Sequence, residues 1–197
     1  MVSPEKPMPA LPADLQEIVR ELARSEQSAW RVTMDLSEEQ RNWHPDDGKA
    51  WSILQCIDHL AKTNIIYTAA LRAAVRRSSS AVARRRGVIQ PGWLARFFLR
   101  SLEPPPRRRF AAKAEVLPAA YLRGDDVLQG FFRSHEEIRS LINESSGFDL
   151  NRIRFRNPFV PLVRFTVGTG LLVMCAHDRR HLWQAEQARA RLKKGTI

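Results

Sequence analysis

Apolar residues recur at helical spacing in four long stretches of the 197-residue chain. The first stretch begins near Asp14, a polar N-cap candidate, and its pattern fades near Thr33. The second stretch has the sharpest start, because Ser52 and Gln55 are spaced as a capping box. Its apolar spacing continues without a proline or glycine to about Arg77. These two stretches predict two long amphipathic helices.

The second half of the chain carries the other two stretches. Asp126 and Gln129 are spaced to open a third long helix, which a Ser-Ser-Gly sequence at 145–147 ends. Thr166 can cap a fourth helix, which is expected to run to Lys193 with basic residues in its last turn.

Shorter elements are predicted between the long helices. One helical turn is expected over Ser37–Trp43, because Ser37 and Gln40 are spaced as a capping box. A short amphipathic helix is expected over Trp93–Leu102, inside a long connection at 78–124. The proline-interrupted residues 157–161 are expected to be extended, and no stretch makes a convincing strand. The fold class is therefore all-α, a four-helix bundle. Its long connection lets the second and third helices run parallel.

Composition narrows the class of protein. With 44% hydrophobic and 27% charged residues, the chain is an ordinary globular one and neither disordered nor collagen-like. Its length fits one domain, 12–197, after a flexible proline-rich tail at 1–11. The sequence predicts no membrane span and no signal peptide. Two cysteines, Cys56 and Cys175, are too few for a disulfide framework, so we expect core cysteines and a cytoplasmic protein.

The net charge of +11 is concentrated in one segment. From Arg72 to Arg109 there are eleven arginines, no lysine and a single acid. Such a segment can bind nucleic acid, another polyanion or a membrane surface, although a solvated loop is the favoured interpretation. The helix expected at 93–102 has Arg96 and Arg100 opposite its apolar residues. We expect it to pack against the bundle or in a homodimer rather than on lipid.

Three of the five histidines are spaced to meet in a bundle. His177 and His181 lie at i and i+4 on the apolar face of the fourth helix, one turn apart. His59 lies on the inward stripe of the second helix, and facing helices supply the ligands of one ion in bundles. Three histidines with an open position are typical of a catalytic metal site. The alternative for each is a hydrogen-bonded core histidine, which the set of three disfavours.

Some neighbouring residues gain a role only if this site forms. Gln55 and Gln184 could orient the ligating imidazoles, or else serve as a helix cap and as ordinary polar surface. Cys56 could close the site as a fourth ligand, but a buried core cysteine is favoured. A zincin-type site is disfavoured, because Asp178 stands where glutamate is needed and only Glu186 remains as a third ligand.

The other histidines and three tryptophans are predicted to be structural. His44 precedes a proline and His135 precedes two glutamates, so both are expected at the surface. Trp43, Trp51 and Trp183 are expected to anchor the core.

A combination of short motifs resembles the DinB/YfiT-like superfamily of metal-dependent bundle proteins. The motifs are Asn42-Trp43-His44-Pro45 with Gly48, Trp51-Ser52-Ile53, His59-Leu60 and His177-Asp178-Arg179-Arg180-His181-Leu182-Trp183-Gln184. The resemblance covers roughly Leu11 to Leu192, apart from the arginine-rich connection. The resemblance implies a bundle in up-down-down-up order and a metal held by His59, His177 and His181. The connection between the second and third helices departs from the family pattern, because it is longer and more basic.

The resemblance also implies a chemistry. Characterised members of the family use a low-molecular-weight thiol, which a metal with an open position activates by lowering the thiol pKa. A metal-bound water would support hydrolysis at the same site. We therefore expect a metal-dependent transferase or hydrolase for a small molecule, with a thiol co-substrate and with zinc or nickel favoured. The alternative is a bundle that binds nucleic acid or another polyanion through 72–109.

Overall fold

The computed structural model describes residues 10–78, 84–106, 111–160 and 162–194. Most of the predicted tail at 1–11, and the arginines at 107–109, lie outside the described residues. The four predicted long helices are confirmed as α1 (Ala13–Thr33), α3 (Ile53–Ser78), α5 (Gly124–Ser145) and α6 (Val167–Lys194). The shorter elements are α2 (Glu38–Asn42), α4 (Trp93–Leu102), the 3-10 turn η1 (Ala114–Val116), and the strands β1 (Arg154–Arg156) and β2 (Arg164–Thr166).

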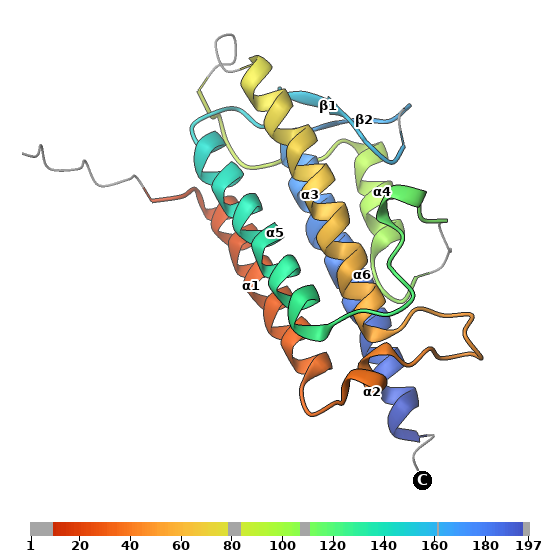
Figure 1. Ribbon diagram of the computed structural model, residues 1–197. Helices are drawn as coiled ribbons and strands as arrows, with labels where there is room; N and C mark the ends of the chain where they lie inside the picture. Colours follow the sequence, from red (N-terminus) through yellow and green to blue (C-terminus); the bar gives the residue numbers. More distant parts are fainter. Residues whose placement is uncertain (1–9, 79–83, 107–110, 161, 195–197) are drawn as a thin grey trace, which may run out of the picture.

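The long helices are arranged in the predicted up-down-down-up order (Figure 1). Helices α1 and α6 run in one direction, and α3 and α5 run in the other. An ion pair between Glu21 and Arg179 joins the parallel helices α1 and α6. The parallel course of α3 and α5 requires the chain to return along the bundle, and the long connection that contains α4 and η1 makes this return.

Apolar residues fill the bundle as two separate clusters. One cluster contains Leu22, Tyr67, Ile138 and Leu171, and extends to the end near the strands. The second lies toward the other end of the same four helices. Each long helix has a short polar interval between the two clusters, and buried polar residues occupy this interval: Ser25, Asn64, His135, Asp178 and His181. The bundle therefore contains a buried polar layer across its middle.

Local capping signals correctly locate three helix starts. Ser37 and Gln40 form a reciprocal capping box at α2. Ser52 and Gln55 form another at α3, and the Thr166 hydroxyl accepts a hydrogen bond from an amide in the first turn of α6. In each case the bonding partners lie within three residues of one another, so sequence spacing is enough to find them.

The predicted capping residues of α1 and α5 are wrong, because Pro12 and Arg123 hold the N-cap positions instead of Asp14 and Asp126. Asp14 lies inside α1, where its carboxylate pairs with Arg85 and accepts a hydrogen bond from the backbone of Ile89. Helix α5 begins at Gly124, whose amide donates to the Glu38 carboxylate of α2. Both arrangements depend on segments distant in the sequence, so spacing within one helix cannot reveal them.

The connecting segments contain the main differences from expectation. The region expected to lack strands holds an antiparallel hairpin, in which Phe155 and Phe165 face the core. Helix α4 has its predicted bounds, but its packing differs, because Trp93 and Phe97 are exposed while Leu102 is buried. No helix in the described parts of the chain is long and apolar enough to cross a membrane.

Candidate metal centre

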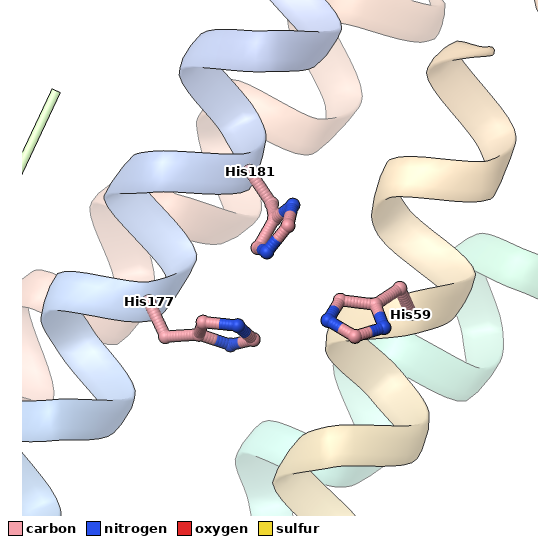
Figure 2. A group of neighbouring side chains, drawn as sticks. All are labelled: His59, His177 and His181. Atoms are coloured by element: carbon pink, nitrogen blue, oxygen red, sulfur yellow. The ribbon is translucent and has the colours of Figure 1, made fainter. Parts of the chain in front are cut away.

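The structure brings the three predicted histidines together at the middle of the bundle. His59 extends from α3 toward α6, and His177 and His181 extend from successive turns of α6 toward α3 (Figure 2). One nitrogen from each ring can be chosen so that all three lie within 4.8 Å of one another. The ring centroids of His59 and His181 are 4.6 Å apart, and those of His177 and His181 are 4.5 Å apart.

The hydrogen bonds around these rings leave nitrogens unused. His59 Nδ1 lies 2.9 Å from the carbonyl oxygen of Val116, so this nitrogen carries the proton and Nε2 presents its lone pair. The Nδ1 atoms of His177 and His181 are buried, and no described residue hydrogen-bonds to them. Buried polar atoms without partners are costly, and each needs an explanation. Three converging imidazoles, two of which have an unpartnered Nδ1 atom, fit a divalent transition metal.

Burial also holds these histidines in the form that binds metals. Burial is the main cause that lowers the pKa of His177 to about 3, with further lowering by His59 and Arg180. Burial likewise lowers the pKa of His181 and that of His59. All three rings are therefore neutral near pH 7, as metal ligation requires.

A cavity of about 950 Å³ adjoins the histidines. Part of its wall is apolar, with Phe98 and Leu102 from α4 and Met174 from α6. Arg180 also lines the cavity, is 4% exposed, and donates a hydrogen bond to the carbonyl oxygen of Ser101 at 3.1 Å. This cavity combines an apolar wall with a few polar groups, as small-molecule sites commonly do.

The charged side chains that line the cavity are mostly cations. They are Lys49, Lys113, Arg180 and Arg191, and the one acid among the described lining residues is Asp46. Asp46 forms an ion pair with Arg191. The electrostatic potential inside the cavity is therefore expected to be positive near Arg180, because that cation is buried beside the histidines.

Three further predictions about the site have different outcomes. The Gln55 amide donates to the carbonyl of Ala119 and accepts from Ser52, so it serves backbone groups and not an imidazole. Gln184 lines the cavity and its side chain interacts with His181. Cys56 is buried as expected, and burial raises the pKa of its thiol to about 12, which disfavours the thiolate that metals bind.

The prediction that His135 lies at the surface is wrong. This ring is fully buried, with Nδ1 3.1 Å from a Glu26 oxygen and Nε2 3.0 Å from an Asp178 oxygen. A carboxylate at each nitrogen means that both nitrogens carry protons. Burial alone would lower the pKa of His135, but the Asp178 and Glu26 carboxylates outweigh it and raise that pKa to about 8. Arg139 completes the group by pairing with Glu26.

A signal for this buried histidine was present in the sequence. His135 lies four residues after Phe131 and three before Ile138, in the apolar stripe of α5. Its neighbours Glu136 and Glu137 are exposed, and they led to the prediction that His135 lies at the surface as well. The partner carboxylates come from α1 and α6, so only the assembled bundle shows why a charged ring is tolerated there.

Other aromatic predictions need smaller corrections. Trp43 is 39% exposed and does not anchor the core, whereas Trp51 and Trp183 are half-buried along the cavity wall. Trp51 stacks on His181 with ring centroids 5.6 Å apart. His44 is half-buried, with its Nδ1 3.2 Å from the carbonyl oxygen of Ala50.

Comparisons with known proteins agree with this architecture. The family model of the DinB superfamily matches residues 21–185. A solved structure, described as YfiT from Bacillus subtilis and as a probable metal-dependent hydrolase with an unusual four-helix bundle topology, is 14% identical in sequence. The TM-score is 0.51, and the match covers 98% of this chain and 95% of that one. At this identity the likeness shows the fold. A search of curated proteins found no match.

Proposed function

Since this chain belongs to the DinB superfamily, we propose that it is a metal-dependent enzyme acting on a small molecule. His59, His177 and His181 would hold one divalent transition metal, zinc or nickel, with an open position toward the cavity. One observation carries this proposal. Three neutral imidazoles converge at a cavity wall, and two of them have buried Nδ1 atoms without a partner among the described residues.

The proposed reaction is transfer of a thiol to an electrophile, with hydrolysis as the alternative at the same site. A metal with an open position supplies Lewis acidity, which lowers the pKa of a thiol or a water. The description of YfiT as a probable metal-dependent hydrolase supports metal chemistry in this fold. The cavity is large enough for a thiol and a second small reactant, because ligand sites commonly enclose roughly 300–1,000 Å³.

The chain's own residues have distinct tasks in this proposal. The Val116 carbonyl holds the proton on His59 Nδ1 and so fixes which nitrogen faces the cavity. Phe98 and Met174 would bind the apolar part of the substrate and exclude water. The Arg180 guanidinium would bind an anionic group of the thiol or the electrophile, because it is a buried cation with several N–H donors.

Metal content is the first test of this proposal. Elemental mass spectrometry on untagged protein should find about one equivalent of a transition metal per chain, since the three histidines form one site. A His59→Ala/His181→Ala variant should contain none. His44→Ala is the matched control, because it removes a half-buried histidine outside the cluster and should leave the metal content unchanged. Absence of metal after incubation with zinc and nickel salts would overturn the proposal.

Activity assays then separate the two reactions. Conjugation of small thiols to monochlorobimane, followed by fluorescence, should depend on the protein and should stop after treatment with a chelator. Hydrolysis of an activated ester without added thiol would identify the hydrolase alternative. An activity that survives complete removal of the metal would contradict both.

A further inference from the structure

The outward side of α4 exposes large apolar residues. Trp93 is 75% exposed and Phe97 is 69% exposed, and Leu94 between them is also exposed. The opposite side of the helix packs on the bundle through Ala95 and Leu102. Exposed aromatic residues grouped on one short helix are unusual, and such patches commonly mark an interaction surface.

Two segments that are distant in the sequence, one of which includes this helix, are rich in arginine. Residues 84–102 and 151–166 contain nine arginines and neither an acid nor a lysine. Contact between Phe98 of α4 and Phe165 of β2, with ring centroids 5.3 Å apart, joins the two segments. We name their exposed surface the basic end, and its exposed arginines are Arg84, Arg86, Arg96, Arg100, Arg152, Arg154, Arg156 and Arg164.

We infer that the basic end docks on an anionic lipid surface, with Trp93 and Phe97 inserted at the boundary between headgroups and acyl chains. Interfacial helices carry this combination of aromatic residues and basic side chains. The exposed tip of the hairpin adds Leu162, which is 98% exposed. Juxtamembrane arginines are attracted to anionic headgroups, and no acid within either segment opposes that attraction.

The composition of the basic end disfavours two other partners, a second copy of this chain and nucleic acid. A twofold contact between two copies would bring the arginines of one copy against those of the other, which is repulsive. Nucleic acid would satisfy the arginines, but it offers no apolar phase for Leu94 and Leu162. This inference does not depend on the metal centre, because none of the three histidines belongs to the basic end.

Vesicle binding by the full chain tests the inference. The protein should cosediment with mixed phosphatidylglycerol–phosphatidylcholine vesicles and much less with phosphatidylcholine alone, and high salt should weaken the binding. Trp93→Ser/Phe97→Ser should weaken it at least roughly tenfold, because the inserted apolar area is lost. Arg96→Gln/Arg100→Gln should weaken it roughly 25-fold, since each such arginine is worth about fivefold.

A matched variant and a depth probe complete the experiment. Trp30→Ser/Arg133→Gln alters an exposed tryptophan and an exposed arginine on α1 and α5, and it should bind vesicles like the parent protein. Acyl chains brominated near the headgroup should quench Trp93 fluorescence. Equal binding of the Trp93→Ser/Phe97→Ser variant, or tight oligonucleotide binding with no lipid quenching, would overturn the inference. A dimer in solution that the Trp93→Ser/Phe97→Ser variant abolishes would also overturn the inference.

Discussion

Two groups of residues around interior histidines lie on neighbouring faces of α6: His59, His177 and His181 form one, and His135 with Glu26 and Asp178 forms the other. The histidines of the two groups differ in charge and in hydrogen bonding. His177 and His181 are neutral, and their buried Nδ1 atoms have no hydrogen-bond partner among the described residues. One residue along the same helix, Asp178 holds His135 in its charged form. Both clusters lie in the polar layer between the two apolar clusters of the bundle. Burial alone therefore does not decide the charge of a histidine.

The difference comes from the neighbouring charges. Burial lowers the pKa of a histidine in both places, because it penalises the charged ring. Beside His135, the carboxylates of Asp178 and Glu26 reverse that effect. Beside His177, the neighbouring His59 and the Arg180 cation lower the pKa further instead. The polar groups around His135 are satisfied within the protein, whereas the Nδ1 atoms of His177 and His181 have no partner among the described residues.

Substitution of His135, which pairs with Asp178 and Glu26, should have the largest effect on the free energy of unfolding. His135→Leu leaves Asp178 buried without its cationic partner, and losing one member of a buried pair costs about 3–5 kcal/mol. Urea unfolding followed by circular dichroism measures the loss. Adding Asp178→Leu to the same chain should recover most of it, because the uncompensated charge is then gone. A loss as small as that of His44→Leu would show that the buried pair does not stabilise the fold.

Substitution of His181 should leave the stability of the metal-free protein intact and should remove its stabilisation by zinc. His181→Leu removes an orphaned nitrogen, so the metal-free protein should be no less stable than its parent. Zinc at about 100 times its dissociation constant should stabilise the parent by about 2.7 kcal/mol, and the variant by nearly nothing. Thermal unfolding with and without zinc distinguishes the two proteins. Equal zinc stabilisation of both would place the metal elsewhere.

The charged cluster should also make stability depend on pH. The folded-state pKa of His135 is raised from 6.5 to about 8, so its stabilisation is complete below about pH 6.5. It is lost as the pH rises through about 8, and the loss should approach about 2 kcal/mol. Urea unfolding across this range measures it. His135→Leu/Asp178→Leu should flatten the profile there, and an unchanged slope in that variant would exclude His135 as its source.

The smallest expected effect concerns Arg180, the cation beside the neutral rings of His177 and His181. Arg180→Met should weaken binding of mercaptosuccinate to cobalt-loaded protein about tenfold, because a charge-assisted hydrogen bond is lost. Binding of the uncharged thiol mercaptoethanol should not change. Arg191→Met is the control, since this cavity residue already pairs with Asp46. The absorption of the cobalt–thiolate complex reports both affinities, and an equal loss for both thiols would argue against recognition of an anion.

Much of the bundle could be predicted, because its signals are local. The capping box of Ser52 and Gln55, the bounds of α4, and the ends of α1 and α5 all depend on residues within one or two turns. The hairpin could not be predicted in this way. Its strands have three residues each, and they are paired across an intervening proline-rich segment.

For the candidate site, the sequence by itself determined which three histidines can meet. Helical periodicity places His177 and His181 on one face, and the inward stripe of the second helix includes His59. Only the tertiary structure decided the protonation of each histidine and the surroundings of α4. Charge state depends on carboxylates and cations brought from other helices, and exposure depends on which side of a helix finds a partner. Neither is a property of spacing along one chain segment.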